Sequence, residues 1–226
     1  MNQYAFLIQN INNTVAESIA AESRPRKVRR NEVAAAFGDH SVVSLVKQGW
    51  FKLARFSESG DEHVVAVRRH GEFIGLDTLS NPTVEMPEVL AMTTGHMLVW
   101  PRAFFDQLYA QDIRFVQAIA GIHASQLEQE VRSRVLNHSA RVSARLAAIL
   151  YQLASDQGER TSSGFKVILP FTQEELAGLM SVRRETISVN LAELEMEGVI
   201  SRSGRSLLVD QTRVKSYLEM NGAVYN

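Results

Sequence analysis

The chain has 226 residues, with 24 lysine or arginine residues, 25 aspartate or glutamate residues and a formal net charge of −1. Hydrophobic residues make up 45% and charged residues 22%, which excludes a disordered or low-complexity chain. Cysteine is absent, which excludes disulfides, thiol nucleophiles and cysteine-bound zinc or iron–sulfur clusters.

The chain carries no sequence signal for a membrane. No apolar run approaches the roughly 20 residues that span a bilayer, and the first residues do not resemble a signal peptide. We therefore expect a cytoplasmic protein with no membrane partner.

The N-terminal segment, residues 1–23, is predicted to form one or two short helices. Residues 24–30 then form the densest basic run of the chain. We favour a solvated strand edge for this run, with contact to nucleic acid or another anion as the alternative.

Short strands and turns are expected between residues 28 and 100. β-branched and aromatic segments alternate there with glycines and turn residues, which predicts an antiparallel barrel or jelly roll. Gly71 and Gly75 bracket Glu72-Phe73-Ile74 and predict a tight turn or a close backbone approach.

A long helix is expected to follow. Pro101 is a favoured helix-start residue, and Asp112 can cap a helix that runs toward Asn137. One stripe of this helix has heptad-like spacing and predicts a dimer interface: Val116, Ala120, Ala124, Leu127 and Val131. A second face carries other apolar residues: Phe115, Ile119 and Ile122. The alternative is one broad stripe within a monomer core.

Residues 172–195 predict a helix-turn-helix. Thr172 and Glu175 form a capping box, and Met180-Ser181-Val182 interrupts the apolar period. A second helix is expected from Arg183 to about Glu195. Three residues would face the core: Ile187, Leu191 and Leu194. Four would lie on the opposite side, with Arg184 on the flank: Glu185, Ser188, Val189 and Ala192. The second helix of such a pair enters the major groove of DNA.

A β-hairpin wing is expected after the helix-turn-helix, with strands at 199–202 and 206–209. Arg202 and Arg205 would meet phosphates there. Residues 171–226 nevertheless contain six basic and eight acidic side chains, so this is not a basic domain. We therefore expect modest nonspecific affinity for DNA with a strong salt dependence.

The predicted order of barrel, long helix and winged helix-turn-helix resembles the Crp/Fnr family of bacterial transcription factors, named for the cyclic-AMP receptor protein and the fumarate-nitrate reductase regulator. The most specific match spans residues 172–209, above all Arg184-Glu185-Thr186-Ile187-Ser188. The resemblance implies an α+β chain with a cyclic-nucleotide-binding-like barrel or jelly roll at 1–110, a dimerisation helix at 111–137 and a winged helix-turn-helix domain at 138–226.

The resemblance also implies a function. It points to a homodimer that binds a pseudo-palindromic double-stranded DNA site, with RNA polymerase as a further partner and no enzymatic activity. The DNA-binding residues would be Arg183, Arg184, Glu185, Ser188, Val189, Arg202 and Arg205. Val189 stands where the family often has arginine, and Ser181 replaces the usual turn glycine. Valine can touch a thymine methyl group but cannot form a hydrogen bond, so the preferred half-site would differ there.

The sensor half departs further from the cyclic-nucleotide branch. Leu76, not glutamate, follows Gly75, and residues 83–88 contain two glutamates and no arginine. Because acidic side chains repel a phosphate, we predict that cyclic AMP is not the ligand. The candidate effector-binding residues are Gly71, Glu72, Gly75 and His123. No metal or cofactor is predicted, although haem bound at His123 stays open.

Two other function classes stay open at this point. The acidic balance of the C-terminal segment suits a signalling module, binding a small molecule or haem, that acts through protein contacts. A metal enzyme built on the barrel would need clustered histidine and carboxylate ligands, and the sequence contains no His-x-His pair.

Overall fold

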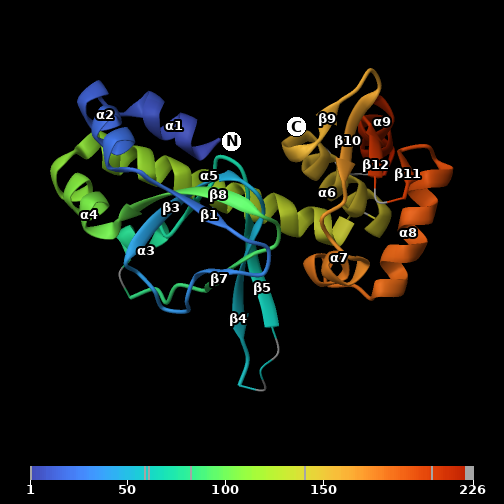
Figure 1. Cartoon of the computed structure of the whole chain (residues 1–226), viewed down its shortest axis with the longest axis horizontal. Coiled ribbons are helices and arrows are strands. Elements are labelled where there is room, and N and C mark those ends of the chain that lie inside the picture. Colours follow the sequence, from blue (N-terminus) through green and yellow to red (C-terminus); the bar gives the residue numbers. More distant parts are fainter. Residues whose placement is uncertain are drawn as a thin grey trace. The chain divides into compact units, whose positions relative to one another are not determined.

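The computed structural model describes residues 2–58, 60, 62–81, 83–139, 141–204 and 206–221, with only the helical backbone at 129, 130 and 132–139. The chain divides into two compact units, residues 1–128 and 129–226 (Figure 1). The three segments predicted from the sequence stay a prediction, because the long helix crosses this division.

The first unit combines helices with short strands. Its elements are α1 (Gln3–Asn10), α2 (Asn13–Glu22), β1 (Arg24–Val28), β2 (Val33–Ala35), β3 (Val42–Gln48), β4 (Phe51–Phe56), β5 (Glu62–Arg68), β6 (Phe73–Ile74), α3 (Asp77–Ser80), β7 (Glu88–Ala91), β8 (Gly95–Pro101), α4 (Arg102–Gln111) and α5 (Ile113–Ser139). The predicted N-terminal helices and the helix start after Pro101 are confirmed.

The strands of the first unit form two antiparallel four-stranded sheets, with orders β1-β8-β3-β6 and β2-β7-β4-β5. A closed barrel requires every strand to pair on both sides. Here the described strands leave β1 and β6 at the edges of one sheet and β2 and β5 at the edges of the other. The predicted β-rich domain is therefore confirmed, whereas closure into a barrel is wrong. Residues 24–28 of the basic run 24–30 form the edge strand β1, so the predicted strand edge is confirmed for that part of the run.

Side-chain alternation along β3 separates two hydrophobic clusters. Val43 and Leu45 pack with Phe73 and Trp100 against the helices, in a cluster that includes residues of α1, α2, α4 and α5. Val46 belongs instead to the second cluster, which fills the space between the two sheets. Because successive side chains of a strand point to opposite faces, one strand supports both layers. Figure 1 shows these helices along one side of the sheets.

The helix α5 buries one face and exposes another. The carboxylate of Asp112 accepts hydrogen bonds from the backbone N–H groups of Arg114 (2.8 Å) and Phe115 (3.0 Å), which confirms the predicted cap. Phe115, Ile119 and Ile122 are completely buried in the first unit. On the predicted dimer stripe, Val116 is half-buried and the other four residues are exposed: Ala120, Ala124, Leu127 and Val131.

After the end of α5, the described part of the second unit consists of four helices and a small sheet. Its elements are α6 (Val142–Gln157), β9 (Glu159–Arg160), β10 (Gly164–Ile168), α7 (Gln173–Met180), α8 (Arg184–Met196), β11 (Ile200–Ser203), β12 (Ser206–Asp210) and α9 (Gln211–Met220). The wing hairpin β11–β12 belongs to a sheet of order β11-β12-β10-β9, so two strands and α9 add to the predicted elements.

The N-terminal helices pack tightly on α5, and Gly121 permits this. A Cβ atom at Gly121 would lie 2.9 Å from Cε1 and Cζ of the Phe6 ring. Elsewhere in the segment, the indole of Trp100 donates to the carbonyl of Ile19 (2.7 Å), and the backbone of Phe73 donates to the side chain of Gln3 (2.8 Å). These contacts anchor residues 3–22 to the sheet as well as to α5.

The Phe6–Gly121 contact predicts that Gly121→Ala has opposite effects on the free energy of unfolding in the natural chain and in a Phe6→Ala chain. In the natural chain we expect Gly121→Ala to destabilise the fold by about 1 kcal/mol, because overpacking displaces α1. In a Phe6→Ala background the same change should stabilise by about 1 kcal/mol, because alanine is the better helix former. Urea unfolding of the four proteins measures this coupling. An equal effect of Gly121→Ala in both backgrounds would contradict it.

Candidate nucleic-acid interface

The turn between α7 and α8 is fixed by side-chain hydrogen bonds. The hydroxyl of Thr172 accepts from the backbone of Glu175 (3.1 Å), and the Glu175 carboxylate accepts from the backbone of Thr172 (2.7 Å). The predicted capping box is thus confirmed. Ser181 ends α7 in the left-handed region (φ 54°, ψ 45°), and the Arg145 guanidinium donates to the carbonyl of Met180 (2.8 Å). These bonds set the angle at which α8 leaves the turn.

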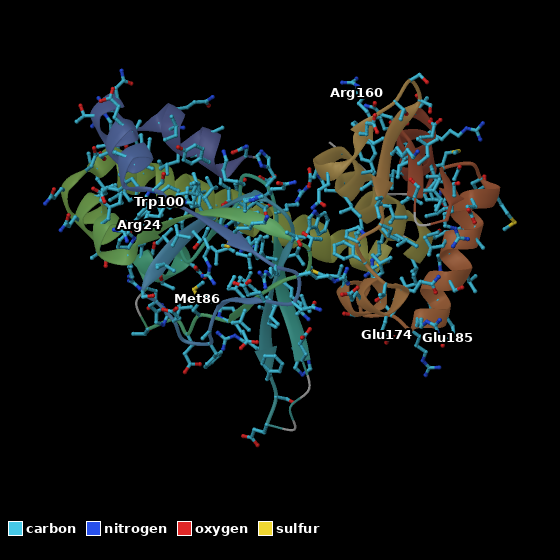
Figure 2. The ribbon with its side chains drawn as sticks, viewed as in Figure 1. Arg24, Met86, Trp100, Arg160, Glu174 and Glu185 are labelled. Atoms are coloured by element: carbon cyan, nitrogen blue, oxygen red, sulfur yellow. The ribbon has the colours of Figure 1, made fainter. Side chains whose placement is uncertain are left out.

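The helix α8 is held by its inner face. Ile187, Leu191 and Leu194 are buried, as the apolar period predicts. The outward residues are exposed: Arg184, Glu185, Ser188, Val189 and Ala192. Figure 2 shows Glu174 and Glu185 near the beginnings of α7 and α8, at the same end of the helix pair.

The charged side chains at the start of α8 are free to meet a partner. Arg183, Arg184 and Glu185 are exposed, and the described part of the chain offers no hydrogen bond or ion pair to any of these three side chains. A guanidinium and a carboxylate side by side can pair with guanine and cytosine edges respectively. The beginning of a helix also favours an anion such as a DNA phosphate.

The wing is tied to α8 by an ion pair that sequence reasoning missed. The Arg202 guanidinium pairs with the Glu195 carboxylate, which also accepts from the backbone of Arg202 (3.2 Å). The Arg202 side chain, through its hydrogen bond and its charge, lowers the pKa of Glu195 below its ordinary value. Arg202 thus holds the wing against α8, and its contact with phosphate stays a prediction. Arg205 lies outside the described residues.

A second tether joins α8 to α6 through α9. The Tyr217 hydroxyl lies 2.7 Å from a carboxylate oxygen of Glu193 and 2.8 Å from the hydroxyl of Ser143. Burial and the neighbouring carboxylate raise the pKa of Tyr217, so the phenol keeps its proton and donates it to Glu193. This tether therefore makes the position of α8 depend on two other helices of its own unit, α6 and α9.

A shallow hollow of about 300 Å³, which includes open solvent, lies in the first unit. Its polar lining residues are Arg68, Asp77 and Gln126, beside Gly75, Leu76 and Met86. Leu76 is buried, so an apolar side chain occupies the position after Gly75. Arg68 comes from β5, far in sequence from the stretch 83–88 where we sought a cation, and sequence reasoning missed it.

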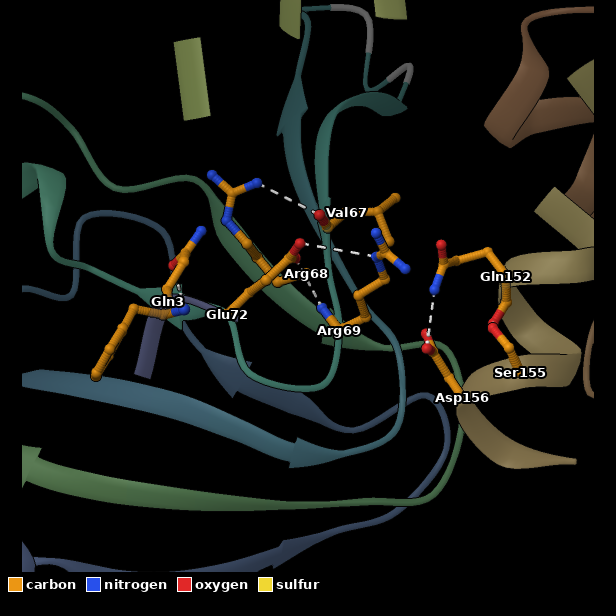
Figure 3. A network of polar contacts seen from close by, with 9 residues as sticks. Gln3, Val67, Arg68, Arg69, Glu72, Gln152, Ser155 and Asp156 are labelled. Atoms are coloured by element: carbon orange, nitrogen blue, oxygen red, sulfur yellow. Dashed lines mark hydrogen bonds and ion pairs between the residues drawn. The ribbon is translucent and has the colours of Figure 1, made fainter. Parts of the chain in front are cut away.

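Of the four candidate effector-binding residues, only Gly75 lines this hollow. The carbonyl of Gly71 instead accepts from the backbones of Gln3 (2.9 Å) and Tyr4 (3.2 Å), so this turn anchors α1. The Glu72 carboxylate is buried and accepts from the backbone of Arg69 (3.1 Å) (Figure 3). Burial raises the pKa of Glu72, against the opposing charges of Arg69 and Arg68. An effector role for these residues stays a prediction.

His123 is half-buried on α5, and its Nε2 atom has no hydrogen-bond partner among the described residues. Burial lowers the pKa of His123, against the charge of Asp77, which favours a neutral imidazole. Within the described ranges, no group of three histidine or carboxylate residues could hold a metal ion. The alternative of haem at His123 stays open. None of the described helices is long and apolar enough to cross a bilayer.

Comparison with known proteins places both units in one class of regulator. Residues 25–112 match the family model of the cyclic nucleotide-binding domain, and residues 144–216 match that of the Crp-like helix-turn-helix domain. An anaerobic regulatory protein of Pasteurella multocida is 22% identical over 201 residues, 88% of this chain and 72% of that protein. The fumarate and nitrate reduction regulatory protein of Yersinia pestis is 21% identical over 200 residues, 88% of this chain and 79% of that protein.

A solved structure shows the same fold. FixK2 from Bradyrhizobium japonicum, 16% identical, matches with a TM-score of 0.70 over 86% of this chain and 96% of that chain. The chain belongs to the Crp/Fnr family of DNA-binding transcription regulators, a family of regulators and not of enzymes. The resemblance seen in the sequence is thereby confirmed, and it favours the regulator over the alternative signalling module.

The buried charge of Glu72 predicts that the difference in stability between the Glu72→Gln protein and the natural protein depends on pH. Glu72→Gln should stabilise the fold by about 1 kcal/mol near pH 7, because the amide oxygen can still accept from Arg69 and the cost of burying the charge outweighs the ion pair with Arg69 (3.7 Å) that is lost. The folded-state pKa of Glu72 is raised, so acidification toward it protonates the natural residue and relieves the same penalty. The advantage of Glu72→Gln should therefore shrink as the pH falls from 7 toward 4.5, the ordinary pKa value of a glutamate side chain.

Thermal unfolding of both proteins across this pH range measures the difference, with Glu22→Gln, at an exposed position of α2, as the control. An advantage that is absent at neutral pH, or that grows on acidification, would contradict the prediction.

Proposed function

We propose that two copies of this chain pair through the outward stripe of α5 and bind one pseudo-palindromic DNA site. The stripe consists of Val116, Ala120, Ala124, Leu127 and Val131. Leu127 and Val131 expose 63% and 54% of their surface in the single chain, and the small residues Ala120 and Ala124, which precede them on the stripe, suit close helix approach. Burying this stripe against a second copy removes apolar surface from water without disturbing the opposite, buried face.

Pairing of two chains places two copies of α8 against the same DNA site. Two recognition helices related by two-fold symmetry meet successive major grooves when they lie about 34 Å apart. In each half-site Arg184 pairs with guanine and Glu185 accepts from cytosine, while Arg183 and Ser188 flank them. Contact with RNA polymerase is part of the same proposal and is supported only by the family.

One observation carries this proposal: the side chains at the start of α8 are exposed and unpaired, while the far end of the same helix is tied into the domain. Charged residues are usual on the solvent face of a surface helix, but here the arginine and the glutamate lie at the start of the second helix of a helix-turn-helix, the end that contacts base edges. The tethers restrict the motion of α8, so the helix itself is already ordered before DNA binds.

Sequence-specific DNA binding tests the recognition residues. A site is first selected from a random palindromic library with the natural protein. Arg184→Ala and Glu185→Ala should each weaken binding to that site by roughly 5- to 150-fold per half-site, because each removes a base-edge interaction. Arg160→Ala removes the same charge at an exposed position on β9 and should change specific binding little. Unaltered specific binding by both α8 variants would contradict the assignment.

The oligomeric state tests the α5 stripe. Leu127→Glu places a charge on the exposed apolar surface and should convert the dimer to a monomer, with a matching loss of affinity for the full palindrome. Arg114→Glu makes a larger charge change at an exposed position of α5 outside the stripe and should leave the dimer intact. Sedimentation of the three proteins distinguishes the outcomes. A Leu127→Glu protein that remains dimeric would rule out this interface.

A further inference from the structure

The outward face of α8 changes character along its length. Its beginning carries Arg184, Glu185 and Ser188, all exposed and able to form hydrogen bonds. The next outward residues are Val189 and Ala192, and Val189 exposes 67% of its surface. An apolar patch thus follows directly on the polar one, on the same side of the helix.

Hydrogen-bonding side chains do exist in the second half of α8, but each is engaged inside the domain. The amide of Asn190 donates to the carbonyl of Thr186 (2.7 Å), within its own helix. Glu193 accepts from Tyr217 (2.7 Å), and Glu195 pairs with Arg202. Beyond Ser188, each strongly hydrogen-bonding side chain of α8 thus already has a partner within the chain, and the outward residues Val189 and Ala192 have none to offer.

We propose that Val189 reads the 5-methyl group of a thymine in each half-site, an inference that rests on the proposed function. Among the four bases, only thymine presents an apolar group in the major groove. A valine against guanine or cytosine would instead desolvate their polar edges without pairing them, which disfavours those bases. The specificity therefore comes from contact with a methyl group and from rejection of polar edges.

Helix geometry gives the place of this thymine. Val189 lies four residues after Glu185, which corresponds to ~6 Å along the helix axis. Successive bases of one strand are ~3.4 Å apart. Because an inclined helix projects a shorter distance onto the DNA axis, the thymine is expected within about two base steps of the cytosine that Glu185 contacts, on the side toward which α8 runs.

Substitution of deoxyuridine for thymine tests the contact one methyl group at a time. In the selected site, each thymine is replaced singly and binding is measured with the natural protein. Replacement of one thymine per half-site, at the expected spacing, should lower the affinity about fourfold, which is the effect of one buried methyl-sized group. Replacement of the other thymines should have little effect. The Val189→Ala protein, which lacks the contacting side chain, should bind the thymine and deoxyuridine sites with similar affinity.

A second variant at position 189 tests whether a new side chain creates a new base preference. Val189→Arg supplies paired donors and should shift the preference at this one base pair from T·A to G·C by about 5- to 150-fold. Met196→Ala removes another exposed apolar side chain, 82% exposed at the end of α8, and should leave the preference and the deoxyuridine effect unchanged.

The outcomes separate this inference from the function on which it rests. Specific binding that no deoxyuridine weakens, together with an unchanged site preference of Val189→Arg, would overturn the reading by Val189 and leave the proposed function standing. An exposed Val189 would then suit a protein partner. A complete absence of sequence-specific binding would overturn both proposals.

Discussion

Burial of Ile187, Leu191 and Leu194 is the constraint on which the account of this protein depends. These side chains fix the rotation of α8 about its own axis, and so decide which residues stand in solvent. Arg184 and Glu185 are outward because the three apolar residues are inward. The capping box of α7, the Arg145–Met180 bond and the left-handed Ser181 then fix the direction in which α8 leaves the turn.

In α5 too, burial of one face decides which residues stay in solvent. Phe115, Ile119 and Ile122 satisfy one side of this helix within the first unit, which leaves the other stripe exposed, where we propose that a second copy binds. The 3.6-residue period thus separates a buried face from an exposed face in both helices. The helical period sets which face of α8 is buried but not where the helix lies. The hydrogen bond Glu193–Tyr217 and the ion pair Glu195–Arg202 restrain α8 relative to α6, α9 and the wing.

Much of this arrangement could be predicted from the sequence because it follows from local signals. The Thr172–Glu175 capping box and the spacing of the apolar residues define α7 and α8, and Asp112 marks the start of α5. The strands β9 and β10 gave weaker signals, since Glu159–Arg160 is short and polar and reads as a loop. Closure of the sheets could not be decided either, because it depends on pairing between distant edges.

Contacts between distant residues were also beyond sequence reasoning. Arg68 reaches the hollow from β5, although the search for a cation had concentrated on residues 83–88. The carbonyl of Gly71 holds the backbone of α1, a contact that no pattern around Gly71 predicts, and its effector role stays a prediction. Arg202 had been assigned to phosphate alone, and its partner Glu195 lies on another element seven residues away. Tertiary structure supplies each of these partners, and no local pattern encodes them.

The central claim is that α8 places Arg184 against guanine in two symmetry-related grooves. Dimethyl sulfate methylates guanine N7, an atom that a bidentate arginine covers in the major groove. On the selected site the account predicts two protected groups of guanines, related by two-fold symmetry and centred about one helical turn apart. Protection in a single groove, or full reactivity of every guanine in a saturated complex, would contradict it.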